Sequence, residues 1–433
     1  MPKFLSYFSL VMATLCSALL GVATAAGPDG IRAADISVGS GSAQTALMLS
    51  QIKRGEPRAA LRGQNLAALR LEQVDLTFGN NGDVKLKSFP KLKTTVSGSL
   101  AALSQSRNVV FFSIDPNLQK FAESLVAQVR SPHVAVVAMD PTNGKVLAVA
   151  QKSNSIPSLA LHAGFPAASL FKLVTSAAAL ERGAISPSSE IAFRGGTYTL
   201  EKWNYKPDRK RDNRHMNVAE ALGRSCNPVF ARIALNHLSP YLLRFYANTF
   251  GFNSQIDFDL PLSKSSAVIP SDDYGLSRTA AGFGAVKISP IHAAALMSGL
   301  ANKGLVPRPI LVNNVINSQG TTLYRAETEM IRRLTRAETS LKLLEMMEQT
   351  TTIGTSRKEF MVGKKPLLKD VRVAAKTGTL RGASPKGINN WFIAAAPIED
   401  PKIAVSVVVV DPQHISTRAS RLGRQMIQRF LGT

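Results

Sequence analysis

The sequence predicts an α/β fold of the α+β type, with an antiparallel sheet flanked by helices and an inserted all-α subdomain. Two observations lead to this prediction. Segments rich in β-branched residues lie near 109–150 and again near 371–410, whereas residues 165 to about 350 have mostly helical patterns. Because both ends of the chain supply strands, we expect the strands to form one sheet and the helical middle to be an insertion.

The first 26 residues are expected to be a secretory signal peptide. Lys3 precedes an apolar run that ends in a small-residue cleavage site, Ala23-Thr24-Ala25. An uncleaved membrane anchor is the alternative, because the run is about long enough to cross a bilayer. The protein is therefore expected to be exported.

Residues 27–107 form a small N-terminal region with weak patterning. Short helices are predicted over 42–55 and 58–73. Residues 74–89 alternate around Asn81-Gly82, which is typical of a β-hairpin with a two-residue turn.

From residue 108 onward the patterns are stronger. A short strand near 109–112 is followed by a helix with Asp115 at its N-cap. Two β-branched strands within 134–150 are joined by a Pro-Thr-Asn-Gly turn. After the helical middle, strands are predicted over 371–379, 390–397 and 402–410, and an amphipathic helix over 415–431.

Composition excludes several classes of function. The net charge is +23, but there is no zinc-finger spacing, RNA-binding aromatic motif or Walker loop, so no nucleic acid is expected. In an exported protein, an anionic cell wall or membrane surface is the more reasonable partner of this charge. The six histidines show no ligand spacing, and Cys226 is alone once Cys16 leaves with the signal peptide. We therefore expect no metal, no cofactor and no disulfide.

The candidate nucleophile is Ser169. It lies three residues before Lys172 in an apolar segment with Pro166 at its start and Gly183 just past its end, so both side chains share one helical face. Burial lowers the pKa of a lysine, and a neutral amine can accept the proton of a serine hydroxyl. The spacing alone is weak evidence, because Ser-x-x-Lys also occurs at Ser50 and at Ser88.

Two further motifs strengthen this assignment. Ser225-Cys226-Asn227 follows a helix-like segment, although Ser-x-Asn also occurs at Ser106. Lys-Thr-Gly occurs once, and Thr379 follows it to close a predicted strand. The residues of this motif are Lys376, Thr377 and Gly378. The three motifs in this order are typical of class A β-lactamases and penicillin-binding proteins.

At these residues the chain resembles the transpeptidase domain of penicillin-binding proteins, over about 108–433. The stretch from Ser113 to Glu123 and the one over 136–150 are similar to class B members. The resemblance implies a β-lactamase/transpeptidase-like fold with a five-stranded antiparallel sheet. It also implies a peptidoglycan D,D-transpeptidase or D,D-carboxypeptidase that is periplasmic or lies at the outer face of the cytoplasmic membrane. Its ligands would be peptidoglycan stem peptides and β-lactams.

The resemblance also implies roles for single residues. Ser169 would attack a D-Ala-D-Ala stem peptide with Lys172 as its base, and Ser225 would pass the proton to the leaving D-alanine. Asn227 would hold the substrate amide. The terminal carboxylate would bind Lys376, Thr377 and Thr379, Gly378 would let substrate lie against the strand, and the N–H groups of Ser169 and Thr379 would form the oxyanion hole.

The sequence departs from the family in one place near the nucleophile. Pro166-Ala167-Ala168-Ser169 stands where the family usually has Pro-Gly-Ser, and it is closer to the Pro-Ala-Ser of class D β-lactamases. Those enzymes usually have valine at the position of Asn227, which argues against them. A class D-like β-lactamase and a penicillin-binding sensor or scaffold without turnover remain the alternatives.

Overall fold

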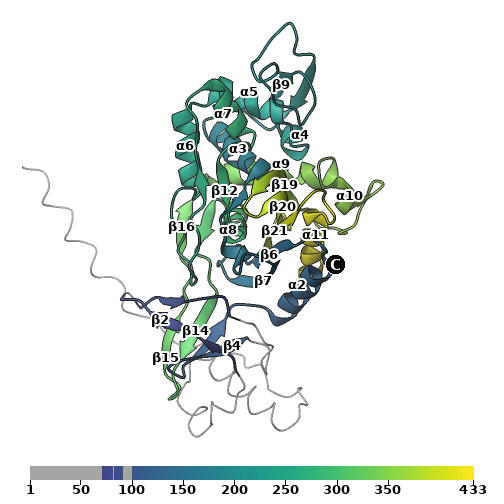
Figure 1. The fold of residues 1–433 in the computed structure, drawn as a ribbon. Helices are drawn as coiled ribbons and strands as arrows, with labels where there is room; N and C mark the ends of the chain where they lie inside the picture. Colours follow the sequence, from purple (N-terminus) through teal and green to yellow (C-terminus); the bar gives the residue numbers. More distant parts are fainter. Residues whose placement is uncertain (1–70, 81, 91–99) are drawn as a thin grey trace, which may run out of the picture.

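The computed structural model describes residues 71–80, 82–90 and 100–433. Three layers of structure follow one another along the long axis in Figure 1. A small sheet lies at one end, the main sheet with its helices lies in the middle, and a helical region lies at the other end.

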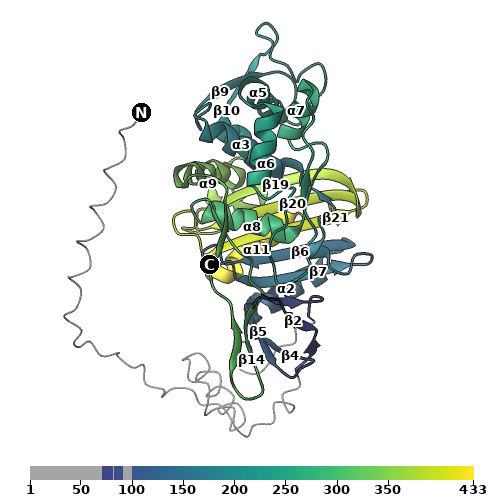
Figure 2. The same ribbon diagram turned by 90° about the vertical axis from the view of Figure 1, so that its left-hand side faces the viewer.

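The main sheet has five antiparallel strands in the order β19-β20-β21-β6-β7, as predicted. Figure 2 shows the strands side by side in this order. Their bounds are β6 His133–Met139, β7 Val146–Ser153, β19 Ala374–Ala383, β20 Lys386–Ala396 and β21 Ile403–Asp411. The join between the two chain ends is the pair β6–β21, in which Val136 lies opposite Val407. Strand β19 is the edge of the sheet.

Helices cover both faces of this sheet, because alternate side chains of each strand point to opposite faces. One face packs on α2 (Pro116–Gln128) and α11 (Ala419–Leu431), and the other packs on α8 (Pro290–Ala301), all of whose residues are buried. Asp115 caps α2 as predicted, since its carboxylate accepts a hydrogen bond of 2.8 Å from the N–H of Leu118.

The predicted final helix begins four residues too early. Residues before Ala419 form a turn, because the carboxylate of Asp411 accepts hydrogen bonds from the N–H and the hydroxyl of Ser416. The N–H of Ala419 then donates to the side-chain oxygen of Asn390, at 2.8 Å, which fixes the first residue of α11 on the sheet.

The insertion between β7 and β19 is mostly rather than wholly helical. Its other helices are α3 Lys172–Glu181, α4 Val218–Gly223, α5 Asn227–His237, α6 Pro240–Thr249, α7 Asp273–Ala280, α9 Ala337–Thr352 and α10 Arg357–Phe360. Short strands lie among them: β8 Phe165–Pro166, β9 Glu190–Phe193, β10 Arg214–Asn217, β11 Ser266–Ala267, β12 Val286–Ile288, β13 Leu305–Pro307, β16 Met330–Arg333, β17 Met361–Val362 and β18 Lys365–Pro366. These strands have two to four residues each, too few to give a readable alternation. The prediction of an all-α subdomain was therefore wrong in this respect.

A second five-stranded sheet lies beyond β7, in the order β1-β4-β5-β14-β15. Its strands are β1 Gln73–Val74, β4 Ala101–Ser104, β5 Val109–Phe112, β14 Val312–Ile316 and β15 Thr322–Arg325. Strand β5 was predicted, but the expectation that it joins the main sheet was wrong, because it pairs with β4 and β14 instead. Strands β14 and β15 come from the part of the chain predicted to be helical, so this sheet was not expected. The predicted boundary at 107/108 falls between β4 and β5, which pair with each other; the division into domains stays a prediction.

The predicted hairpin at 74–89 is present as β2 (Leu76–Phe78) paired with β3 (Val84–Leu86). The predicted signal peptide and the helix over 42–55 lie outside the described residues, as does most of the helix over 58–73, whose described end at Gln73 is strand rather than helix. Among the residues that the structure describes, no helix is both long enough and apolar enough to span a membrane.

One buried carboxylate joins the second sheet to the insertion. Asp259, which is 1% exposed, accepts hydrogen bonds of 2.7 Å from the N–H groups of Leu311 and Val312 and one of 3.0 Å from the guanidinium of Arg308. These bonds hold the start of β14 in place.

We predict that Asp259→Ala lowers the free energy of unfolding by about 3–5 kcal/mol, because it leaves a buried cation and two N–H groups without their acceptor. The matched control is Asp257→Ala, since the Asp257 side chain is 53% exposed and also lies near Arg308, at 3.8 Å. An exposed pair contributes about 0–1 kcal/mol. Chemical denaturation of both variants measures the difference, and equal losses would contradict the prediction.

Candidate active site

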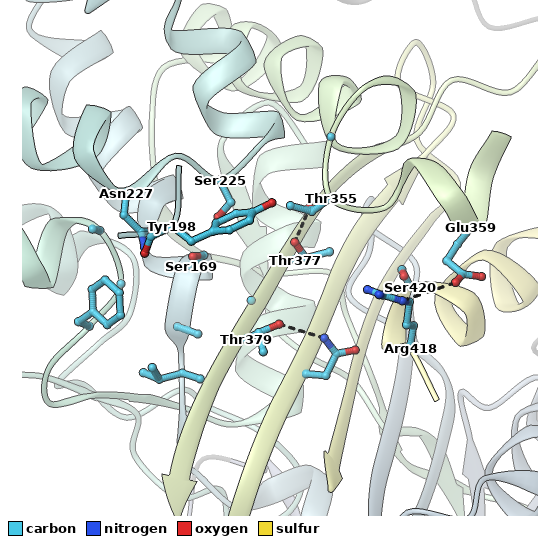
Figure 3. A pocket seen from close by; sticks show the side chains of 18 of the residues that line it. Ser169, Tyr198, Ser225, Asn227, Thr355, Glu359, Thr377, Thr379, Arg418 and Ser420 are labelled. Carbon is cyan, nitrogen blue, oxygen red and sulfur yellow. Dashed lines mark hydrogen bonds and ion pairs between the residues drawn. The ribbon is translucent and has the colours of Figure 1, made fainter. Parts of the chain in front are cut away.

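A cleft of about 550 Å³ opens between the helical insertion and the edge strand β19. Six of the eight residues singled out in the sequence line it: Ser169, Ser225, Asn227, Thr377, Gly378 and Thr379. Figure 3 shows Ser169, Ser225 and Asn227 close together, with Thr377 and Thr379 beside them. The other two, Lys172 and Lys376, are fully buried behind this lining.

Ser169 lies in a 3₁₀ turn, η3 (Ala168–Phe171), directly before α3 rather than in the first turn of an α-helix. The predicted start of the helix at Pro166 was wrong, because Pro166 belongs to β8 and pairs with Lys287 of β12. The chain then turns sharply at Ala168, whose φ is +50°. The predicted end is right: Gly183, with φ +65°, follows the last turn of α3.

The amine of Lys172 contacts three oxygen atoms from three segments. Its Nζ lies 2.8 Å from the hydroxyl of Ser169, 2.7 Å from Oδ1 of Asn227 and 2.6 Å from the carbonyl oxygen of Ala281. Burial lowers the pKa of Lys172 well below 10.5, and the positive charge of Lys376 lowers it further. Burial therefore shifts Lys172 towards its neutral form beside Ser169.

The second serine of the site, Ser225, contacts a second buried lysine, Lys376. Lys376 donates hydrogen bonds to the hydroxyl of Ser225, at 3.0 Å, and to the carbonyl oxygen of Thr377, at 2.8 Å. Burial lowers its pKa to about 7. Ser225 lies in the turn between α4 and α5 with φ +58°, a conformation that is unfavourable for a residue with a side chain. The turn is strained in a way that places the hydroxyl next to Lys376.

Asn227 uses both ends of its amide within the protein. The oxygen accepts from Lys172, and Nδ2 donates to the carbonyl oxygen of Tyr198 at 2.7 Å. An amide nitrogen carries two hydrogens, so one remains for a ligand in the cleft. Asn227 thus links the amine of Lys172 to the backbone at Tyr198.

Sequence reasoning missed the partners of the two threonines. The hydroxyl of Thr377 lies 2.5 Å from that of Thr355, and the hydroxyl of Thr379 accepts from Nδ2 of Asn390 at 3.1 Å. Thr355 ends the stretch Thr-Thr-Ile-Gly-Thr over 351–355, whose resemblance to penicillin-binding proteins was a usable signal. Asn390 lies opposite Thr379 on β20, a relation that only the strand register reveals.

Two glycines let neighbouring segments pack directly against the backbone of the turn that carries Ser169, which we call the nucleophile turn. A Cβ atom on Gly378 would lie 3.2 Å from the carbonyl oxygen of Ala167 and 3.2 Å from Cβ of Ala168. A Cβ atom on Gly282 would lie 2.2 Å from the carbonyl oxygen of Ala168 and 2.8 Å from the nitrogen of Ser169. Gly378 thus makes room for the protein's own turn, in addition to any room that it leaves for a ligand.

Of the repeated motifs elsewhere in the chain, the one at Ser106 lies wholly within the described residues, and it forms no such site. Ser106 lies in a turn of the second sheet, where its hydroxyl bonds the side chain of Asn108 at 3.0 Å. Ser50 and Lys53 lie outside the described residues, as does Lys91, the partner of Ser88. Among the described residues, no group of His, Cys, Asp and Glu could hold a metal ion.

Comparisons with known proteins add to this geometry. Peptidoglycan D,D-transpeptidase PbpA of Mycolicibacterium smegmatis is 26% identical over 315 residues, which cover 64% of this chain and 62% of that protein. Stage V sporulation protein D of Bacillus subtilis is 23% identical over 317 residues, covering 68% of this chain and 48% of that protein. The chain thus spans about half to three fifths of the length of these relatives.

Solved structures show the same fold. The imipenem acyl-enzyme complex of penicillin-binding protein A from M. tuberculosis superposes with a TM-score of 0.61 at 25% identity, covering 77% of this chain and 80% of that one. The penicillin G acyl-enzyme complex of the same protein gives 0.59 at 26% identity, over 76% and 81%. A family model, the penicillin binding protein transpeptidase domain, matches residues 134–428. Because this match extends over well more than half of the sequence, the chain belongs to the penicillin-binding protein transpeptidase family.

Proposed function

We propose that this chain is a peptidoglycan D,D-transpeptidase that forms an acyl-enzyme at Ser169 on stem peptides ending in D-Ala-D-Ala. The observation that carries the proposal is the 2.8 Å contact between the hydroxyl of Ser169 and the buried amine of Lys172 at the wall of the cleft. A serine without an adjacent base is a weak nucleophile, and a neutral amine at hydrogen-bond distance supplies that base.

The proposed reaction begins when Lys172 takes the proton of Ser169 as the hydroxyl oxygen attacks the carbonyl carbon of the penultimate D-alanine. The N–H groups of Ser169 and Thr379 stabilise the negative charge that develops on the carbonyl oxygen. The C–N bond then breaks, and the proton taken by Lys172 passes through the hydroxyl of Ser225 to the departing nitrogen of D-alanine. Lys376 donates to Ser225 at 3.0 Å and so holds this hydroxyl in place.

The carboxylate of the leaving D-alanine is proposed to bind between Lys376, Thr377 and Thr379. The two threonine hydroxyls are already oriented by Thr355 and Asn390. The same subsite would take the carboxylate of a β-lactam. Ordered donors of this kind lose little entropy when the anion binds.

Either an amine or a water molecule can attack the resulting ester. Attack by an amine makes the enzyme a transpeptidase, and attack by water makes it a D,D-carboxypeptidase. A class D-like β-lactamase would instead carry a carboxyl group on Lys172. Nζ of Lys172 is within 2.7 Å of the oxygens of both Asn227 and Ala281. A carboxyl group added to Nζ would place a negative charge next to these two oxygen atoms, which would repel it. We therefore favour slow deacylation.

We also propose that the chain is exported and acts at the cell wall, either in the periplasm or at the outer face of the cytoplasmic membrane. Support comes from the apolar N-terminal run and from the names of its relatives. The high positive charge, +23, fits a surface that lies against an anionic cell wall or membrane.

We predict that Ser169→Ala abolishes labelling by a fluorescent penicillin and leaves the melting temperature nearly unchanged, since one hydroxyl contributes little to packing. In the wild type, the adduct should last for many minutes in a chase after labelling. Ser88→Ala, in the other Ser-x-x-Lys spacing, is the control and should label normally. A label that persists in Ser169→Ala would contradict the assignment of the nucleophile, and rapid loss of the adduct would favour a β-lactamase.

The glycine behind the nucleophile provides a second prediction. Gly282→Ala should slow labelling by about a hundredfold, because the new Cβ displaces the backbone of Ser169 and misplaced reacting groups lose rate steeply. The control is Gly284→Ala. Gly284 also has a positive φ, +85°, but a Cβ there would meet only Thr279, at 3.4 Å. Both variants lose some stability from backbone strain, so their labelling rates are compared under conditions in which both are equally folded. Equal rates would contradict the prediction.

A third prediction concerns pH. The second-order rate constant of labelling should rise with pH at values well below 10.5, because only the neutral form of Lys172 accepts a proton. It should fall again as the pH passes about 7, because Lys376 then loses the charge that is proposed to bind the carboxylate. Lys376→Met removes a nearby positive charge, so the pKa of Lys172 should increase and the midpoint of the rise should move to higher pH. The midpoint of this pH profile does not depend on how much the substitution lowers the overall labelling rate. An unshifted midpoint would show that the two lysines do not interact.

A further inference from the structure

The cleft continues beyond Thr377 and Thr379. Three charged residues line its far end: Lys358 and Glu359 of α10, and Arg418, which is the N-cap residue of α11. In Figure 3, Ser169 and the pair formed by Glu359 and Arg418 lie on either side of Thr377 and Thr379. One continuous cavity therefore connects the nucleophile to a charged end.

The charges at this end are incompletely paired. Nε of Arg418 is 4.0 Å from Oε1 of Glu359, the outer limit of an ion pair, and the Arg418 side chain is 55% exposed. Lys358 is exposed and makes no ion pair with any residue in the described part of the chain. Two cations and one anion leave a net charge of about +1 facing the cleft, which suits a negatively charged group on a ligand.

The proposed function assigns a position to that ligand. The acyl group of the donor occupies Ser169, and the leaving D-alanine extends from it towards Thr377 and Thr379. The attacking amine must approach the ester from the side that the leaving group vacated, because the acyl chain occupies the other side. The body of the acceptor then extends past the two threonines into the charged end.

Resting on the proposed function, we propose that Lys358 and Arg418 form an acceptor subsite, which selects amines that carry a carboxylate remote from the reacting nitrogen. The amine nitrogen forms a bond to the carbonyl carbon of the ester, and the bond from that carbon to Oγ of Ser169 breaks. The amine loses one proton, which returns to the serine oxygen. Glu359 opposes the remote carboxylate and limits its binding.

Two acceptors that differ only in this group test the proposal. D-2-aminoadipate has a carboxylate where D-norleucine has a terminal methyl group. The full chain is supplied with an N-acyl-D-alanyl thioester donor and both acceptors in competition, and the ratio of the two amide products is measured. We expect the wild type to favour D-2-aminoadipate by about two- to fivefold, since the ion pairs are partly exposed, and the preference should fall as salt increases.

Substitutions then assign the preference to residues. Lys358→Gln and Arg418→Gln should each bring the product ratio towards one, and Glu359→Gln should increase it. Arg421→Gln, an exposed position on α11 that does not line the cleft, should leave the ratio unchanged. The two amide products are compared within each variant, so a substitution that slows both reactions equally does not change their ratio.

Two results would overturn the proposal: a wild-type ratio of one, or a ratio that neither Lys358→Gln nor Arg418→Gln changes. An acyl group that leaves Ser169 only to water would overturn it as well. Mass spectrometry distinguishes these outcomes from failure of the proposed function, in which the thioester would leave no acyl group on Ser169 at all.

Discussion

The buried amine of Lys172 is the interaction on which the arrangement of the site depends. It bonds oxygens from the nucleophile turn, from α5 and from the loop after α7, three segments far apart in the sequence. A charged amine without partners would cost several kcal/mol at this depth. Burial shifts Lys172 towards the neutral form, in which its two hydrogens can bond Asn227 and Ala281 and its lone pair can face the hydroxyl of Ser169. The contacts thus fix the position of Ser169, and burial lowers the pKa of its neighbour.

Strain accompanies this arrangement. Ala168 and Ser225 both adopt positive φ, and each such residue costs about 1–2 kcal/mol when it has a side chain. Both flank the cleft, and both are followed by helices that are packed into the core. Gly282 and Gly378 relieve the crowding around the turn. The packing of the insertion on β19 therefore holds the hydroxyl groups of Ser169 and Ser225 in positions that an isolated peptide would not adopt.

Much of the fold and of the candidate site could be predicted from the sequence. The remaining features depend on contacts between residues far apart in the chain. The main sheet was predictable because β6, β7 and β21 are long and rich in valine. Ser169, Lys172 and Lys376 were found because motif order restricts them. Strand β14 was missed, since its sequence Val-Asn-Asn-Val-Ile is short and partly polar. Thr355 and Asn390 have their roles only through pairing across the fold, which no local pattern encodes.

The central place of β21 has a consequence for how the chain folds. It lies between β20 and β6, so the main sheet is incomplete until residues Ile403–Asp411 are available. The pair of Val136 and Val407 closes a loop of most of the chain, and long loops are slow to close. During synthesis, the apolar faces of β6 and β7 are made long before β21, the partner strand of β6. We expect this sheet to form late, only after β21 has emerged, and the pairing of β21 with β6 to limit the rate of folding.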